Sequence, residues 1–222
     1  MKPWPSELPP LPAATPLDRP VALLLRHAER PPLAPGEHGT DLALTARGLR
    51  CAELLGTTLG PRILSISTSP VRRCRDTAEA LRRGANIEVD IVDDHLLGDP
   101  GVFVLDPELA WTHWQTIGHE AVVEHMAYED PPLPGLAPAH SAALKLVQHM
   151  RLALSDSHAG LHVFVTHDAV LFPLVARVLP SPRHRHAWPA FLEAAALWNG
   201  NDTPIVSYRR RSHAIHNEAV SP

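Results

Sequence analysis

The chain alternates short apolar runs with longer segments in which apolar residues recur every three or four positions. Short apolar runs are typical of strands that are buried on both faces. Apolar residues at helical spacing predict helices that pack one face against a sheet. The expected strands are 21–25, 62–67, 87–92 and 161–166, and the expected helices are 46–59, 69–84, 141–154 and 169–179.

This alternation predicts an α/β fold. Chains of this kind form a three-layer sandwich, in which a mainly parallel sheet lies between helices on both faces. Two further apolar segments, 193–198 and 204–209, flank the dipeptide Asn199-Gly200 and predict a hairpin at the end of the sheet. A chain of 222 residues is long enough for one core, so we expect a single domain over residues 1–222.

Three segments lie outside this alternation. Residues 1–20 are rich in proline and predict an irregular lead-in. Residues 93–139 contain one helical segment, 107–128, and then a proline-rich break, and we expect them to cover one end of the sheet as a small cap insertion. Residues 210–222 are mostly polar and are expected to form a loose tail.

Charged and polar residues follow three of the expected strands. The first strand is followed by Arg26, His27 and Arg30, the second by Arg72, Arg73 and Arg75 early in the next segment, and the fourth by His167 and Asp168. Because the carboxyl ends of parallel strands meet at one edge of a sheet, we expect these side chains to converge.

Such a cluster has the groups that phosphoryl transfer requires. An arginine guanidinium can bind a tetrahedral oxyanion through two parallel hydrogen bonds. A neutral histidine can act as the nucleophile, a protonated second histidine can stabilise the transferred group, and a carboxyl group can protonate the leaving oxygen. The pattern therefore predicts transfer through a phosphohistidine, without an obligatory metal or cofactor.

Four segments of the chain also carry a resemblance to a known family. They are Arg26-His27-Ala28, Leu44-Thr45-Ala46-Arg47-Gly48, Ser69-Pro70-Val71-Arg72-Arg73-Cys74-Arg75-Asp76-Thr77-Ala78-Glu79, and Val163-Phe164-Val165-Thr166-His167. Taken together and in this order, they resemble the motifs of the histidine phosphatase superfamily, the phosphoglycerate mutase-like group. The resemblance implies that His27 is the nucleophile and that Arg26, Arg73 and His167 complete a phosphate pocket. It places Arg72 and Arg75 outside that pocket.

The chain departs from the family pattern at two positions. Ala28 stands where the family usually has glycine, which adds a methyl group where the backbone would approach the phosphate. Gly98 stands where the mutase-like branch usually has the glutamate that protonates the leaving group. The usual proton donor of that branch is therefore missing from its expected place.

Other residues resemble the acid phosphatase branch of the same superfamily. That branch has an aspartate directly after the second histidine, as Asp168 is here, and an arginine at the position of Arg30. The resemblance implies Asp168 as the proton donor and Arg30 as an additional phosphate contact. Asp99 and Glu29 are alternative donors.

Composition sets the remaining expectations. A net charge of -4 gives no sign of a nucleic-acid-binding face, and no apolar run approaches the ~20 residues of a membrane span. Two cysteines in a chain of this length favour a reducing compartment, so a cytoplasmic protein is expected. His119 and His125 are too far apart for a His-Glu-x-x-His zinc motif, so no metal site is predicted. The sequence does not indicate an oligomeric state.

The expected function is that of a metal-independent phosphatase acting on a phosphorylated small molecule, or on a phosphoprotein. A phosphoglycerate mutase-type phosphotransferase and a non-catalytic phosphate-binding module are the alternatives. Specificity is expected to reside in residues 93–139, where Trp111 and Trp114 either anchor the cap by packing or line the substrate mouth. The basic run His184-Arg185-His186 is interpreted as a solvated loop or, alternatively, as a contact for an anionic substrate.

Overall fold

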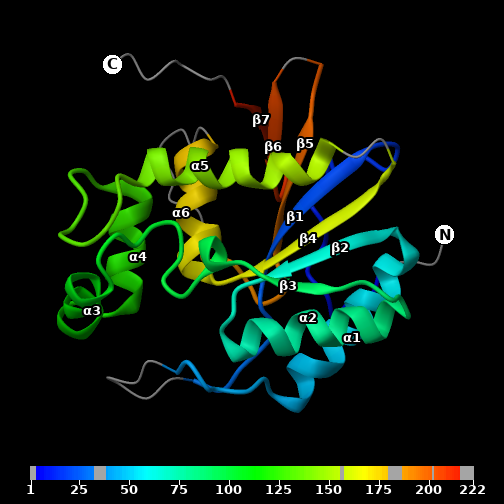
Figure 1. The fold of residues 1–222 in the computed structure, drawn as a ribbon, viewed down its shortest axis with the longest axis horizontal. Coiled ribbons are helices and arrows are strands. Elements are labelled where there is room, and N and C mark those ends of the chain that lie inside the picture. The colour runs from blue at the N-terminus through cyan, green and yellow to red at the C-terminus, as the bar shows by residue number, and fades with distance from the viewer. Residues whose placement is uncertain (1–3, 33–38, 156–157, 180–186, 202, 216–222) are drawn as a thin grey trace.

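A computed structural model describes residues 4–32, 39–155, 158–179, 187–201 and 203–215. Within these residues, seven strands form one sheet in the order β3-β2-β4-β1-β5-β6-β7 (Figure 1). The strands are β1 (Pro20–Arg26), β2 (Ile63–Thr68), β3 (Ile91–Asp93), β4 (Gly160–Thr166), β5 (Ala194–Asn199), β6 (Pro204–Tyr208) and β7 (Arg211–Ala214).

The four strands from β3 to β1 are parallel, whereas β5, β6 and β7 pair antiparallel along the other edge. Arg26 at the end of β1 is paired with Thr166 of β4, and Thr68 at the end of β2 is paired with Val165 of β4. This register brings the carboxyl ends of three strands to the same level. The sheet is therefore mixed, with a parallel half that carries the predicted site.

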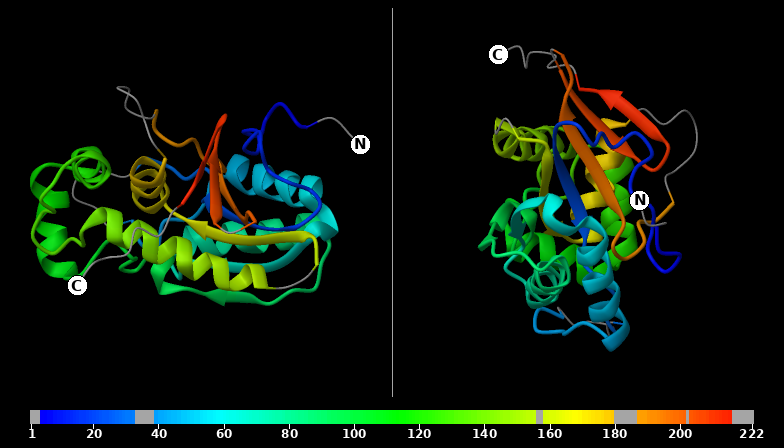
Figure 2. Two further views of the ribbon diagram at one scale, coloured as in Figure 1. Left: turned by 90° about the horizontal axis from the view of Figure 1, so that it is seen from above. Right: turned by 90° about the vertical axis from the view of Figure 1, so that its right-hand side faces the viewer.

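Helices cover both faces of the sheet, as the sequence predicts. The α-helices are α1 (Ala46–Leu59), α2 (Arg72–Ala85), α3 (Pro107–Thr116), α4 (His119–Tyr128), α5 (Ala139–Leu152) and α6 (Asp168–Val178). Short 3-10 turns are η1 (Gly60–Arg62), η2 (His95–Leu97) and η3 (Ala153–Ser155). Figure 2 shows α1 and α2 on one side of the sheet and α5 and α6 on the other. The three-layer α/β sandwich is confirmed.

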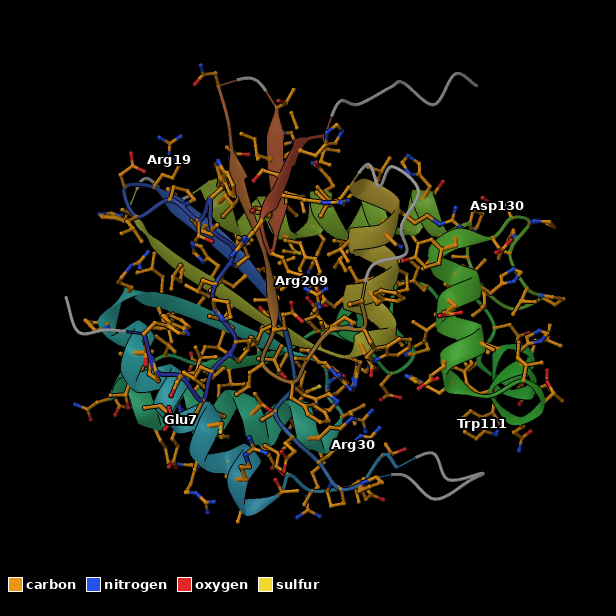
Figure 3. All side chains as sticks on the ribbon, turned by 180° about the vertical axis from the view of Figure 1, so that it is seen from behind. Glu7, Arg19, Arg30, Trp111, Asp130 and Arg209 are labelled. Atoms are coloured by element: carbon orange, nitrogen blue, oxygen red, sulfur yellow. The ribbon has the colours of Figure 1, made fainter. Side chains whose placement is uncertain are left out.

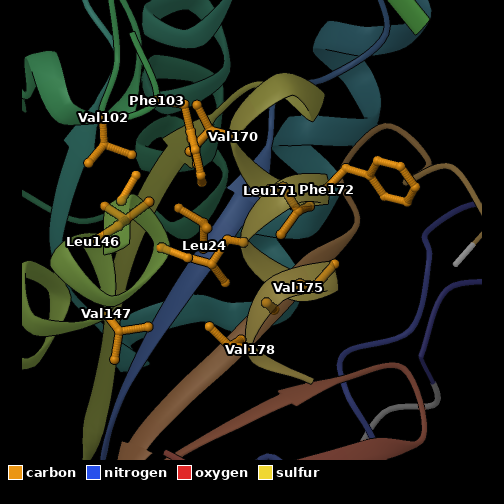
Figure 4. Close-up of a cluster of buried hydrophobic side chains, with 14 of the residues drawn as sticks. Leu24, Val102, Phe103, Leu146, Val147, Val170, Leu171, Phe172, Val175 and Val178 are labelled. Atoms are coloured by element: carbon orange, nitrogen blue, oxygen red, sulfur yellow. The ribbon is translucent and has the colours of Figure 1, made fainter. Parts of the chain in front are cut away.

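The alternation of side chains along β1 divides the core between the two faces. Leu24 packs with residues of α5 and α6 such as Val147 and Leu171 (Figure 4). Its neighbours Leu23 and Leu25 point the other way and pack with α1 and α2. Because both faces are buried, the strand can be apolar throughout up to Arg26.

Residues 93–139 form α3, α4 and the loops around them, at one end of the molecule beside α6 (Figure 1). The guanidinium of Arg177 on α6 donates to the carbonyls of Met126 (2.8 Å) and Glu129 (2.5 Å), and pairs with Asp130 (2.9 Å). These bonds, together with the apolar contacts of α4 on α6, attach this segment to the sandwich.

Four sequence expectations need correction or refinement. The single helix expected over 107–128 is two helices, because Gly118 has a positive φ of 82° that interrupts the helical backbone. The third strand is shorter than 87–92 and comprises only Ile91–Asp93. Four residues of the expected loose tail form β7, whereas residues 216–222 lie outside the described residues. The lead-in is irregular, as predicted, but Leu8 within it is buried.

Throughout the described residues, no helix has the length and apolar character that a bilayer crossing requires.

Candidate active site

A cavity of about 630 Å³ opens where the carboxyl ends of β1, β2 and β4 meet the segment 93–139. Five of the six residues predicted for the site line this cavity: His27, Arg30, Arg73, His167 and Asp168. The sixth, Arg26, is buried directly behind Asp168. The structure therefore brings the whole predicted set together.

His27 is held as a neutral imidazole. Its Nδ1–H donates to the Ala28 carbonyl at 2.8 Å, which leaves Nε2 unprotonated to accept from Arg73 Nε at 3.2 Å. Burial, reinforced by the positive charge of Arg73, lowers the pKa of His27 to about 3. The Nε2 lone pair is thus available for attack on an electrophile at neutral pH.

His167 lies across the cavity floor from His27, with 5.5 Å between the ring centroids. Its Nδ1 accepts from Arg73 Nη2 at 3.0 Å, so Nε2 carries the proton and donates to Ser69 Oγ at 2.9 Å. Burial and the charge of Arg73 also hold its pKa well below 6.5. Both histidines are therefore neutral beside a fixed cation.

Arg73 connects the two histidines. It is the second residue of α2, so its guanidinium extends from a helix N-terminus, where the peptide dipoles favour anions. Its Nη1 donates to the Gly39 carbonyl at 2.8 Å, which fixes the plane of the group. Arg72 and Arg75 point away from the cavity: the first pairs with Asp76, and Arg75 Nε donates to Asp93.

Arg26 and Asp168 form a buried ion pair. Arg26 Nη2 lies 2.6 Å from Asp168 Oδ2, and both side chains are 8% exposed. The other terminal nitrogen of Arg26 donates to the Pro189 carbonyl at 2.5 Å, and its guanidinium carbon lies 4.2 Å from the centre of the Phe191 ring. Because a buried charge is costly without a partner, each member of this pair holds the other in place.

Asp168 accepts three further hydrogen bonds. His119 Nε2 donates to Oδ1 at 3.2 Å, Trp188 Nε1 donates to Oδ2 at 3.2 Å, and the Ala169 amide donates to Oδ1 at 2.9 Å. Burial alone would raise its pKa, but the bond from His119 and the charge of Arg26 outweigh burial and hold the pKa well below 3.8. Asp168 is therefore an ionised carboxylate in this arrangement.

Two arginine nitrogens near the cavity have no acceptor. Arg26 Nε and Arg30 Nε are buried and make no hydrogen bond with the described residues, although Arg30 Nη1 donates to the Pro31 carbonyl at 2.8 Å. Buried donors are nearly always satisfied in native proteins. Of the two side chains only Arg30 lines the cavity, so its unsatisfied N–H indicates a site for an anion there.

The two alternative proton donors differ in position. Asp99 lines the cavity, and its carboxylate makes no hydrogen bond or ion pair within the described part of the chain. Glu29 does not line the cavity; it accepts from Thr45 Oγ1 at 2.9 Å and from Arg47 at 3.2 Å. These bonds give Glu29 a structural role at the start of α1.

Gly98 lies against the second histidine. A Cβ at this position would come within 2.6 Å of Ser69 Oγ and 2.7 Å of His167 Nε2, and the φ of 152° also favours glycine. The glutamate that the mutase-like branch usually has at this place would therefore displace the hydrogen bond between Ser69 and His167. The structure explains why this position is glycine here.

Other residues of the sequence motifs hold the backbone directly after His27 in place. Thr77 Oγ1 accepts from the Ala28 amide at 3.0 Å, and the Thr45 amide donates to the Glu29 carbonyl at 2.9 Å. A Cβ on Gly48 would lie 2.2 Å from that same carbonyl, so only glycine allows α1 to approach this closely. The methyl group of Ala28 packs with α1 and α2, not in the cavity, so it does not narrow the phosphate pocket.

Three residues of the site escaped the sequence analysis. His119 and Trp188 bind Asp168, and Phe191 contacts both Arg26 and His27. Each lies far along the chain from the motifs that it supports. The described residues contain no group of three or more histidine, cysteine, aspartate or glutamate side chains arranged to hold a metal ion, and this includes the surroundings of His119.

Comparisons with known proteins agree with this geometry. The family model of the histidine phosphatase superfamily (branch 1) matches residues 22–197. A solved mycobacterial hydrolase is similar in fold, with a TM-score of 0.57 at 19% identity over 87% of this chain and 95% of that one. No curated protein matches the sequence.

Two further solved structures share the fold. A mycobacterial glucosyl-3-phosphoglycerate phosphatase has a TM-score of 0.56 at 20% identity, over 86% of this chain and 99% of that one. A phosphoserine phosphatase mutant from Entamoeba histolytica has a TM-score of 0.53 at 14% identity, over 84% and 94% of the two chains. At these identities the likeness shows a common fold.

Proposed function

The chain belongs to the histidine phosphatase superfamily (branch 1), and from this premise we propose that it hydrolyses a phosphomonoester through a phosphohistidine on His27. One observation supports this most directly: His27 Nε2 is unprotonated and accepts a hydrogen bond from Arg73 Nε, while Nδ1–H is bonded to the Ala28 carbonyl. This is the tautomer that a nucleophilic imidazole requires. The reaction proposed needs no metal ion.

In the first step, His27 Nε2 attacks phosphorus and the bond to the ester oxygen breaks. Arg73 Nε, which now donates to His27 Nε2, would transfer its hydrogen bond to a phosphoryl oxygen. The unsatisfied Nε–H group of Arg30, which lines the cavity, would bind another oxygen, with His167 beside it. Arg26 would add positive charge from behind Asp168. These fixed donors would stabilise the charge that spreads over the phosphoryl oxygens in the transition state.

The leaving oxygen also needs a proton, and we assign its transfer to Asp168. Since Asp168 is ionised before substrate binds, the proton would arrive with the ester in its monoanionic form, whose second pKa is about 6. Asp168 would accept that proton and deliver it to the alkoxide. It would then take a proton from the water that attacks the phosphohistidine, which breaks the bond between phosphorus and nitrogen and restores His27. Asp168 would return this proton to the product phosphate and become ionised again.

The two alternatives have less support. A mutase would have to hold the phosphorylated product for return of the phosphoryl group, and the cap side of the cavity is mainly apolar (Phe103, Val104, Ala110 and Met126). A non-catalytic module would not need the proton-transfer group Asp168 beside a nucleophilic histidine.

The proposal is tested with an aryl phosphate as substrate and with an alkaline quench that preserves the acid-labile phosphoamidate. We expect His27→Ala to abolish both phosphate release and labelling of the protein. His140→Ala, which removes an exposed histidine on α5, is the matched control and should leave both unchanged. A chelator should not change the rate. Turnover by His27→Ala at the wild-type rate would refute the proposal.

A further inference from the structure

We infer that the natural substrate is the phosphomonoester of an uncharged, mainly apolar alcohol, which the cap side of the cavity binds. This inference rests on the proposed function and adds the class of leaving group. It follows from the size of the cavity, from the residues that line its cap side, and from the distribution of charge around it.

The cavity is much larger than a phosphoryl group. Its volume of about 630 Å³ lies within the ~300–1,000 Å³ of pockets that enclose whole small-molecule ligands. The charged side chains Arg73 and Asp168 and the neutral imidazoles of His27 and His167 are gathered at the sheet end. Most of the volume therefore remains for the alcohol part of the ester.

The surface facing that volume is predominantly aromatic and aliphatic. Phe103, Val104, Ala110 and Met126 of the segment 93–139 line it, with Val170 of α6. Leaving-group carbon atoms that bind against these side chains are removed from water, at about 0.8 kcal/mol per methylene.

Two tryptophans of α3 enlarge this apolar surface. Trp111 and Trp114 both line the cavity, and Figure 3 marks Trp111 on α3 and Arg30 at the sheet end. Trp114 Nε1 donates to His119 Nδ1 at 3.1 Å, and His119 Nε2 donates to Asp168. The indole N–H of Trp114 is thus already satisfied, so its ring offers the substrate apolar surface rather than a donor.

The charge around the cap side excludes a second anionic group on the substrate. Residues 93–139 contain nine aspartates and glutamates but no lysine or arginine. A carboxylate or second phosphate on the leaving group would find no lysine or arginine of residues 93–139 to pair with, which is unfavourable. The basic run 184–186 lies outside the described residues. The test below includes phosphoserine, whose carboxylate would reveal a cation that this run supplies.

The acidic residues of 93–139 also do not gather at the cavity, where they would bind a cationic leaving group. Of the nine acidic residues in 93–139, only Asp99 lines the cavity, and Asp168 is neutralised by Arg26. The lining is otherwise aliphatic as well as aromatic. An uncharged alcohol therefore fits it better than an ammonium group.

The test compares four esters of primary alcohols, so that leaving-group reactivity is similar: 2-phenylethyl phosphate, glucose 6-phosphate, phosphoserine and phosphocholine. Phosphate release gives kcat/KM for each. We expect 2-phenylethyl phosphate to be preferred over each of the other three by about 100-fold or more. A preference for any of those three would overturn the inference while leaving the proposed function intact.

Variants on α3 locate the selectivity. Trp111→Ala should reduce the preference for the phenylethyl ester over glucose 6-phosphate by about tenfold. Leu109→Ala is the matched control, because it removes an exposed apolar side chain of the same helix that does not line the cavity, and it should keep the ratio. Gln115→Arg, which places a cation at the cavity lining, should raise kcat/KM for phosphoserine. Equal effects of Trp111→Ala and Leu109→Ala on the ratio would contradict the inference.

A binding measurement separates this inference from the proposed function. If no ester is hydrolysed, the proposed function fails, and the inference is then judged with two phosphonates that cannot turn over. By calorimetry, 2-phenylethylphosphonate should bind at least about tenfold more tightly than 3-phosphonopropionate. Equal affinity, or tighter binding of the carboxylated compound, would refute the apolar leaving-group site.

Discussion

The replacement Asp168→Asn tests one chemical step, the delivery of a proton to the leaving oxygen. The substitution keeps the shape of the side chain but removes its charge and its ability to carry a proton between substrate and product. It leaves Arg26, which is 8% exposed and 2.6 Å away, without its counter-ion. Two effects are therefore expected, one on chemistry and one on stability.

The size of each effect follows from its cause. A positioned general acid contributes roughly 10²–10⁴-fold in rate, or about 2.7–5.4 kcal/mol of transition-state free energy. This loss applies only to esters whose alkoxide needs a proton. Breaking the buried pair between Arg26 and Asp168 lowers the free energy of unfolding by about 3–5 kcal/mol, whatever the substrate.

The assay exploits this difference. We expect kcat on 2-phenylethyl phosphate to fall by about 10²–10⁴-fold in Asp168→Asn, and kcat on 4-nitrophenyl phosphate, whose phenolate leaves without a proton, to fall by less than about tenfold. Asp99→Asn is the matched control, since Asp99 lines the same cavity and was an alternative donor. Urea unfolding of each variant, followed by assays well below the midpoint, removes the contribution of unfolded enzyme.

Equal losses on the two esters would refute the donor role of Asp168 and leave it as a group that positions Arg26. A loss restricted to the alkyl ester in Asp99→Asn instead would transfer the role to Asp99.

Three further changes test other parts of the site. Gly98→Ala should lower kcat by at least about tenfold and the free energy of unfolding by about 1–3 kcal/mol, measured by initial rates and urea titration, because its Cβ would lie 2.7 Å from His167 Nε2; unchanged rates would show that this histidine can shift without loss. The pKa of His27 is about 3 in the folded protein and about 6.5 in the unfolded chain, so the unfolded chain binds a proton at a higher pH than the folded protein does. The contribution of His27 to the free energy of unfolding should therefore be fully present above pH 6.5. It should fall by up to about 1.4 kcal/mol per pH unit as the pH decreases from 6.5 to 3. His27→Gln should flatten that slope in urea titrations at each pH, and an identical slope would contradict the assignment. Burial raises the pKa of Cys74 to about 12, so an alkylating reagent at pH 8 should modify Cys51 well before Cys74 in native protein, as read by peptide mass spectrometry; early modification of Cys74 would show that the second-histidine side of the site opens.

The sequence was informative where local pattern and topology act together. The apolar run before Arg26 could be identified as a strand because both of its faces are buried, and its end fixes the level of His27. His167 follows β4, which pairs with β1, and Arg73 follows β2, which pairs with β4. Because these strands are parallel, both residues lie at the same edge of the sheet as His27. This is why the residues that converge at the cavity could be named without coordinates.

The sequence was less informative where a single residue changes the backbone or where support comes from far along the chain. Gly118 lies within a segment of continuous helical spacing, so periodicity alone could not reveal the positive φ that separates α3 from α4. That break places His119 at the start of α4, where it reaches Asp168 across 49 residues of sequence. Trp188 reaches the same carboxylate from a loop, and no short-range pattern predicts such a contact.

The contacts of Asp168 also bear on how the site matches its substrate in charge. Arg26, Arg30 and Arg73 supply three positive charges, and Asp168 supplies one negative charge, while burial keeps both histidines neutral. The phosphate end of the cavity therefore carries a net charge of two positive units, which attracts the monoanionic ester proposed as the substrate form. Without the ion pair of Asp168 the same three arginines would carry three, and product phosphate would be held more tightly than the reaction requires. We therefore expect Asp168→Asn to bind product phosphate more tightly, measured as a lower inhibition constant for phosphate with 4-nitrophenyl phosphate as substrate, and an unchanged constant would contradict this role of the carboxylate.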